Sequence, residues 1–79
     1  MEIKVKYFGM LSELVGKEQE VLEMESGSDT SALKEKLFKK YDSLSTYDYK
    51  LALNLDLIQG EASLKDNDEV AFLPPYAGG

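Results

Sequence analysis

The sequence predicts an α+β fold in which a mixed sheet of four to five strands is crossed by one main helix. Three observations lead to this prediction. Polar and apolar residues alternate over residues 2–7, an apolar stripe recurs at helical spacing over residues 30–41, and a short apolar segment at residues 70–73 runs into two prolines. Because a sheet and an amphipathic helix can bury their apolar faces against each other, we expect a single domain over residues 1–79.

The first third of the chain predicts a strand, a short helix and a second strand. The alternation over residues 2–7 is typical of a strand with one buried face. Residues 8–15 carry apolar side chains at helical spacing, and Gly16 stands where such a helix would end. Residues 21–24 then favour a second strand, which the glycine- and serine-containing residues 26–29 interrupt.

The longest helix is expected to begin near Thr30 and to end near Tyr41. Leu33, Leu37 and Tyr41 recur at intervals of four residues, while lysines and glutamates occupy the remaining faces. Asp29 or Thr30 is suited to cap the N-terminus. An amphipathic helix can also bind a membrane or a partner, but no other long helix is predicted to cover the sheet. We therefore assign this helix to the core.

The middle of the chain predicts a turn and two further strands. Residues 42–48 are polar and turn-like. Residues 50–55 have a leucine at every second position from Leu51 to Leu55, which predicts a third strand with these leucines on one face. Residues 56–60 are less regular and suggest a short edge strand.

An acidic segment, residues 66–69 (DNDE), precedes the last strand. It lacks the spacing of a calcium-binding loop, and aspartate and asparagine are common in turns, so we expect a turn there and no metal site. The elements in chain order are strand, short helix, strand, long helix, strand, small strand and strand. This is the order of the β-grasp fold.

The composition excludes several classes of function. The chain has 79 residues, no cysteine, no histidine and a net charge of −6. It therefore has no thiol nucleophile and no cysteine- or histidine-ligated metal. The negative charge disfavours nucleic acids and anionic membranes as partners and favours a positively charged protein surface. No apolar run approaches the roughly 20 residues of a membrane span, and no signal peptide is evident, so a cytoplasmic location is expected.

The C-terminal segment is the candidate functional element. The strand at residues 70–73 must end at Pro74 and Pro75, which cannot donate ladder hydrogen bonds and which favour an extended exit. We expect a flexible tail over about residues 74–79 that ends in Gly78 and Gly79, whose lack of side chains leaves a terminal carboxylate unobstructed. The simple alternative is a frayed terminus without function.

Three segments resemble one known family. They are residues 7–16 (YFGMLSELVG), 52–54 (ALN) and 68–79 (DEVAFLPPYAGG). They resemble the corresponding segments of the small, ubiquitin-like subunits of molybdopterin synthase. The resemblance spans the whole chain, and residues 68–79 are its most specific part. The chain departs from the family pattern at Ser12, where a basic residue is frequent, and at Asn67, where glycine is usual. The second change is conservative because asparagine also tolerates positive φ.

The resemblance implies a sulfur carrier that is not catalytic by itself and binds no cofactor. An E1-like adenylating enzyme would use ATP to activate the carboxylate of Gly79, and a sulfur donor would convert it into a thiocarboxylate. The sulfur would then build the dithiolene of molybdopterin from a cyclic pyranopterin precursor, on the pathway to the molybdenum cofactor. Gly78 would provide clearance, and four preceding residues would guide the tail: Pro74, Pro75, Tyr76 and Ala77.

The same resemblance implies a large-subunit partner, in an arrangement of two small subunits on a large-subunit dimer. By their matching positions, Phe8, Leu57 and Leu73 are the candidate contact residues, with burial in the core as the alternative for each. Three other functions stay open: a sulfur carrier for another pathway, such as thiazole synthesis; a ubiquitin-like modifier joined to lysines of target proteins; and an interaction domain with an inert tail.

Overall fold

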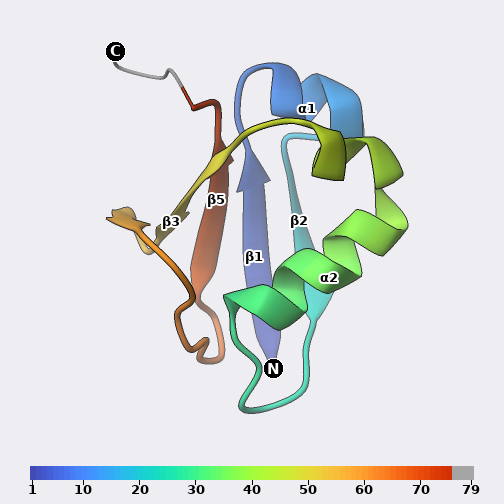
Figure 1. Cartoon of the computed structure of the whole chain (residues 1–79). Helices are drawn as coiled ribbons and strands as arrows, with labels where there is room; N and C mark the ends of the chain where they lie inside the picture. The colour runs from blue at the N-terminus through green and yellow to red at the C-terminus, as the bar shows by residue number, and fades with distance from the viewer. Residues whose placement is uncertain (76–79) are drawn as a thin grey trace.

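The computed structural model describes residues 1–75, in which a five-stranded sheet packs against two helices (Figure 1). Residues 76–79 lie outside the described part of the chain. The elements, in chain order, are β1 Glu2–Tyr7, α1 Met10–Val15, β2 Gln19–Glu23, α2 Thr30–Lys40, the 3-10 helix η1 Asp42–Thr46, β3 Lys50–Leu53, β4 Asp56–Ile58 and β5 Glu69–Leu73.

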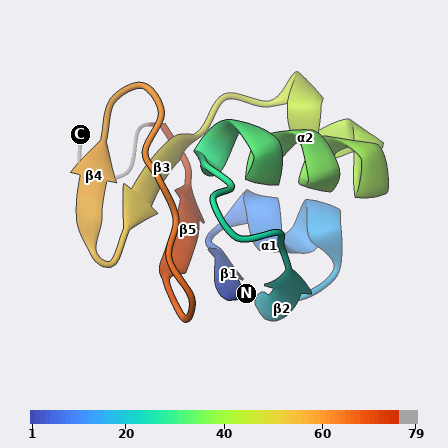
Figure 2. The ribbon, with the colours of Figure 1, turned by 90° about the horizontal axis from the view of Figure 1, so that it is seen from below.

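The strand order is β2-β1-β5-β3-β4. The two central strands, β1 and β5, run parallel although they come from opposite ends of the chain, whereas every other neighbouring pair is antiparallel. In the view from below, α1 and α2 lie on one side of this sheet (Figure 2). The predicted α+β, β-grasp architecture with a mixed sheet and one main helix is therefore confirmed.

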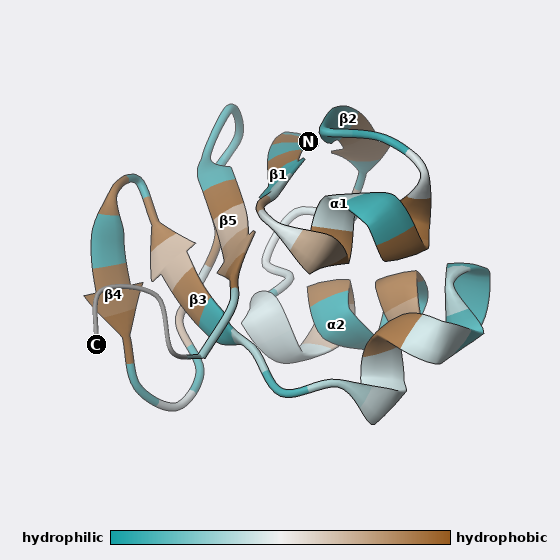
Figure 3. Ribbon diagram, turned by 90° about the horizontal axis from the view of Figure 1, so that it is seen from above, coloured by the Kyte–Doolittle hydropathy of each residue, from teal (hydrophilic) through white to brown (hydrophobic). Residues whose placement is uncertain are grey.

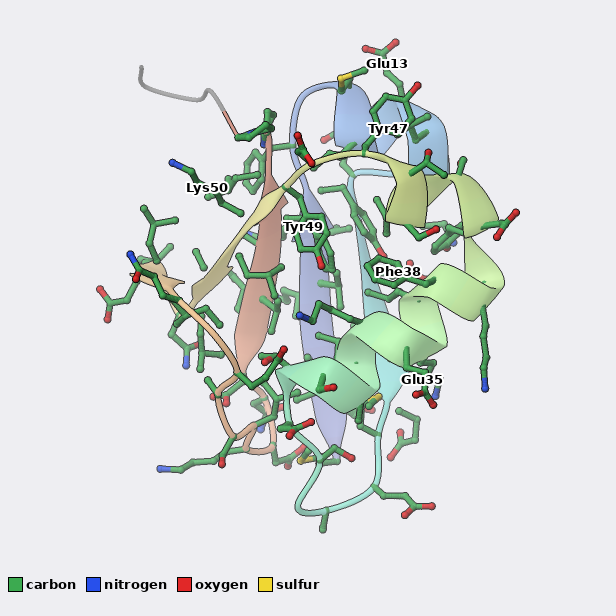
Figure 4. All side chains as sticks on the ribbon, viewed as in Figure 1. Glu13, Glu35, Phe38, Tyr47, Tyr49 and Lys50 are labelled. Carbon is green, nitrogen blue, oxygen red and sulfur yellow. The ribbon has the colours of Figure 1, made fainter. Side chains whose placement is uncertain are left out.

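The core lies between α2 and the central strands. Phe72 of β5 is fully buried at its centre, where its ring centroid lies 5.8 Å from that of Tyr7 and 5.2 Å from that of Tyr49. Tyr49 and Phe38 of α2 point toward one another, with ring centroids 6.0 Å apart, whereas Lys50 points away from the core (Figure 4). This aromatic packing fastens the helix to the middle of the sheet.

The ends of α2 follow from local chemistry. The Asp29 side chain accepts a hydrogen bond of 3.0 Å from the backbone N–H of Ala32, so Asp29 is the N-cap. Lys39 and Lys40 stand in the last turn, where the helix dipole favours cations. With eleven residues, α2 is the longest helix described, and no helix within residues 1–75 has the length and apolar character needed to cross a membrane.

A partly buried carboxylate ties the C-terminal end of α2 to β1 and β2. Glu20 accepts hydrogen bonds from the hydroxyls of Tyr7 and Tyr41, at 2.6 and 2.8 Å, and from Lys40 Nζ at 2.8 Å. Burial alone would raise the pKa of Glu20, but the hydrogen bonds from Lys40, Tyr7 and Tyr41 outweigh it and lower the pKa to about 2. The Glu20 carboxylate is therefore ionised in the folded protein at neutral pH, and its charge strengthens these three hydrogen bonds.

Three local expectations need correction. Residues 42–48, expected as a turn, contain the 3-10 helix η1, because Leu44 is buried in the core and draws this segment inward. The second strand is β2, Gln19–Glu23, and starts before the expected residue 21 because pairing with β1 extends it. The third strand does not extend to Leu55, because β3 ends at Leu53 and a tight turn follows.

The acidic segment at residues 66–69 forms the expected turn. One carboxylate oxygen of Asp68 accepts from the backbone N–H of Lys65 at 2.8 Å, and the other accepts from the side chain of Asn54 at 3.0 Å. Asn67 has a φ of 70°, so asparagine here occupies a conformation that glycine also adopts readily. The side chain of Asp68 therefore stabilises this turn through hydrogen bonds.

Candidate functional site: the chain exit and the open face of the sheet

The chain leaves the sheet at the position that the sequence predicted from its two prolines. β5 ends at Leu73, directly before Pro74 and Pro75. On one side Leu73 pairs with Lys50 of β3, and on the other the backbone N–H of Phe8 donates a 3.1 Å hydrogen bond to the carbonyl of Phe72. The exit of the chain is therefore anchored to neighbouring segments on both sides. The predicted tail residues Tyr76, Ala77, Gly78 and Gly79 lie outside the described residues.

A tight turn after β1 supports this exit. The backbone N–H of Leu11 donates to the carbonyl of Phe8 at 3.1 Å, and Gly9 between them has φ 58° and ψ −137°, a conformation open mainly to glycine. A Cβ atom at Gly9 would lie 3.0 Å from Cγ of Pro74, so glycine also makes room for the proline ring. Ser12 closes the turn, because its hydroxyl donates to the carbonyl of Gly9 at 2.7 Å.

Gly9 is a site residue that reasoning from the sequence missed. A glycine between a strand and a helix predicts a turn, but it does not show which distant segment lies against that turn. The contact with Pro74 joins residues from opposite ends of the chain. It exists because β1 and β5 are adjacent and parallel, so that both strands end at the same edge of the sheet.

The face of the sheet opposite α2, here called the open face, is not covered by any helix within residues 1–75. Alternation along β5 directs Val70 and Phe72 into the core and Ala71 and Leu73 toward the open face. Ala71 pairs with Ala52 of β3, so their small side chains form the centre of this face.

The three residues predicted to contact a partner are all at least partly exposed. Leu57 of β4 pairs with Ala52, faces the same way and is 63% exposed. Leu73 is partly buried on the same face, at the exit of the chain. Phe8 follows the core-facing Tyr7 and is 43% exposed. None of the three is among the fully buried residues of the core.

The open face has an uneven distribution of charge. Near the exit of the chain it carries Lys50 and Lys6, and Lys6 Nζ lies 3.5 Å from a carboxylate oxygen of Glu69. At the far end of the face, Glu2 pairs with Glu23. A partner that covers the exit therefore meets Lys50 and the Lys6–Glu69 ion pair beside apolar side chains, on a chain whose net charge is −6.

The described residues contain no side-chain cluster suited to catalysis by a metal. The sequence lacks histidine and cysteine, and no group of three potential metal ligands comes together within residues 1–75. The candidate site comprises the open face of the sheet and the anchored chain exit.

Comparisons with known proteins agree with this description. The chain is 38% identical to the molybdopterin synthase sulfur carrier subunit of Escherichia coli, with 98% of this chain and 99% of that protein aligned. It is 34% identical to the protein of the same name from Chlamydomonas reinhardtii, with all of both chains aligned. The model that describes the ThiS family matches residues 5–79.

Solved structures share the fold. A protein from Pyrococcus furiosus described as a putative molybdopterin converting factor, subunit 1, superposes with a TM-score of 0.86 at 28% identity, covering 95% of this chain and 98% of that one. A chain in the complex of subunits 1 and 2 of the molybdopterin-converting factor from Helicobacter pylori superposes with a TM-score of 0.71 at 24% identity, covering all of both chains. The second likeness concerns the fold alone.

The fold, the anchored exit and the open face of the sheet define a ubiquitin-like β-grasp protein. The match over residues 5–79 and the full-length similarity to curated relatives make the assignment more specific. The chain belongs to the ThiS family.

Proposed function

We propose that this chain is the sulfur carrier subunit of molybdopterin synthase. The observation that carries the proposal is the similarity to subunits of that name over essentially the full length of both chains, at up to 38% identity. The family match extends to residue 79 and thus includes Gly78 and Gly79. The anchored exit at Leu73 and the open face support two requirements of a carrier, a fixed point from which the tail begins and a surface for docking.

The chemistry takes place at the carboxylate of Gly79. A free carboxylate is a poor electrophile, so an E1-like enzyme first uses ATP to form an acyl-adenylate, and a sulfur donor then displaces AMP to give a thiocarboxylate. The thiocarboxylate donates its sulfur to a cyclic pyranopterin precursor and thereby contributes to the dithiolene. The chain holds neither histidine nor cysteine, so its partners supply the acid and base groups. It requires no cofactor of its own.

The large synthase subunit docks on the open face. Leu57 and Leu73 present apolar surface there, Phe8 lies beside the exit, and Lys50 and Lys6 add positive charge around it. Exposed apolar side chains that gather on one face of a small protein mark an interaction site. The proposed assembly contains two copies of this chain on a large-subunit dimer. We place it in the cytoplasm, because a chain without cysteines forms no disulfides and does not depend on an oxidising compartment.

Intact mass spectrometry tests the proposed chemistry. The chain is incubated with the adenylating enzyme, ATP and a sulfur source, and the expected product carries sulfur in place of one terminal oxygen. Deletion of Gly79, or addition of one residue after it, should abolish both sulfur loading and transfer to the pyranopterin. The circular dichroism spectrum and unfolding midpoint should stay unchanged, because the core lies within residues 1–75.

Each remaining function predicts a different outcome. Sulfur loading without transfer to the pyranopterin in the presence of the large subunit would indicate a carrier for another pathway. Conjugates with lysines of target proteins would indicate a modifier. An unchanged mass with every partner would leave an interaction domain with an inert tail.

A further inference from the structure

The hairpin between β3 and β4 contains an unusual turn. Leu53 pairs with Asp56, so the connection consists of Asn54 and Leu55, and both have positive φ, 50° and 76°. This is the pattern of a type I′ turn, whose second central position strongly favours glycine. The hairpin therefore places a leucine where backbone geometry calls for a glycine.

The first residue of the turn is explained by its contacts. Asn54 donates its side-chain N–H to a carboxylate oxygen of Asp68 and accepts from the backbone N–H of Glu69, both at 3.0 Å. Its own backbone N–H donates to the carbonyl of Glu69 at 2.8 Å. Asparagine also tolerates the left-handed conformation better than most residues. These bonds fix the turn against the start of β5.

Leu55 has no comparable explanation within the fold. In the left-handed conformation the Cβ of an L-residue comes close to the following carbonyl oxygen, which disfavours it. The Leu55 side chain is 87% exposed, so burial does not compensate for this strain. Strained residues that the fold does not require are candidates for function.

The position of Leu55 links it to the open face. Leu57, two residues further along the same hairpin, is 63% exposed on that face. The hydrophobic segments of the β3–β4 hairpin lie at the edge of the sheet (Figure 3). Leu55 thus continues the apolar surface from Leu57 to the tip of the hairpin.

The distance from the chain exit indicates what kind of partner binds Leu55. Lys50, at the other end of β3, pairs with Leu73 at the exit, so the hairpin tip lies about 15 Å away at ~3.3 Å per residue. Stable interfaces bury about 800 Å² on each partner. Because this molecule measures only 32 × 24 × 18 Å, such an interface must cover most of the open face and reaches the hairpin. The large synthase subunit, which the proposed function docks on the open face, therefore extends to Leu55.

We propose that Leu55 is an anchor for the large synthase subunit and that its side chain inserts into an apolar pocket of that subunit. The inference rests on the proposed function and adds to it a specific contact at the tip of the hairpin. Turn geometry holds the leucine outward, so its burial costs little further ordering of the backbone.

The substitution Leu55→Gly separates folding from docking because it should change them in opposite directions. Removal of the left-handed leucine should raise the melting temperature by roughly 2–6 °C, after allowance for the greater freedom of glycine in the unfolded chain. Loss of the side chain should weaken binding to the large subunit by about 10- to 100-fold in calorimetric titration. Leu55→Asn should weaken binding similarly without destabilising the turn.

Asn67→Gly is the matched control. Asn67 also has positive φ, 70°, but its side chain is polar and lies in a different turn. This variant should change the folding stability only slightly, because glycine also adopts positive φ readily. It should leave the affinity for the large subunit within twofold of wild type, a threshold of roughly 0.4 kcal/mol.

Two results would overturn the inference. One is a Leu55→Gly variant that binds the large subunit as tightly as the wild type; the other is a defect confined to adenylation, which would assign Leu55 to the activating enzyme. Failure of the proposed function would look different, because the wild-type chain itself would then not bind the large subunit or accept sulfur.

Discussion

The two faces of the sheet share one backbone but differ in what surrounds their side chains. On the face that α2 covers, Val70 and Phe72 are fully buried and pack against the helix. On the open face, Leu57 is 63% exposed, and the apolar residues near it line a surface. Buried area determines stability, so substitutions on the covered face should affect folding, whereas those on the open face should affect binding.

The largest effect on stability is expected for Phe72→Ala. Its ring packs against Tyr7 and Tyr49, and removal of a buried phenylalanine costs about 3–5 kcal/mol. The total free energy of unfolding of a chain of this length is on the order of 4–12 kcal/mol, so this loss removes a large part of it and leaves the variant close to unfolding. Urea denaturation measures it.

Leu57→Ala is the matched variant on the open face. Its cost in folding free energy should stay below about 1 kcal/mol, because more than half of the side chain is already exposed. Equal destabilisation by the two substitutions would contradict the division between the faces.

Glu20→Gln should have an intermediate effect on the covered side. The neutral amide weakens three hydrogen bonds to a charged acceptor, with an expected loss of about 1.5–3 kcal/mol at pH 7. The pKa of Glu20 in the folded protein is about 2, below its ordinary value of 4.5, so the stabilisation is complete above pH 4.5 and is lost as the pH falls toward 2.

The pH dependence provides the test of the Glu20 network. The unfolding free energy of the wild type should fall more steeply than that of Glu20→Gln between pH 4.5 and 2. Other carboxylates titrate in both proteins, so the difference between the two curves reports on Glu20. Parallel curves would show that the network does not stabilise the ionised form.

Phe8→Ala should also have a small effect on stability. Its ring is 43% exposed beside the exit of the chain, so we expect a cost below about 1.5 kcal/mol. Binding to the large subunit should weaken by a larger free energy, measured by calorimetric titration. If the affinity falls only because less of the protein is folded, Phe8 stabilises the fold and does not contact the large subunit.

Local sequence patterns predicted much of the fold. The alternation in β1, the spacing of Leu33 and Leu37, and the prolines after Leu73 each correspond to an observed element or boundary. Phe8, Leu57 and Leu73 were selected by the family resemblance and not by any local pattern. The prediction was wrong at Leu55, because a regular leucine alternation continues there although the backbone turns.

The sequence by itself determined the class of fold, the position where the sheet ends and the composition of the terminal segment. Hydrophobic period, capping residues and prolines act within a few neighbouring residues, so they can be read directly from the chain. Only the tertiary structure decided that β1 and β5 are adjacent, that Gly9 supports Pro74 and that Glu20 joins β1, β2 and α2. These contacts depend on strand order and register, which are set by the burial of the whole core and not by any single segment.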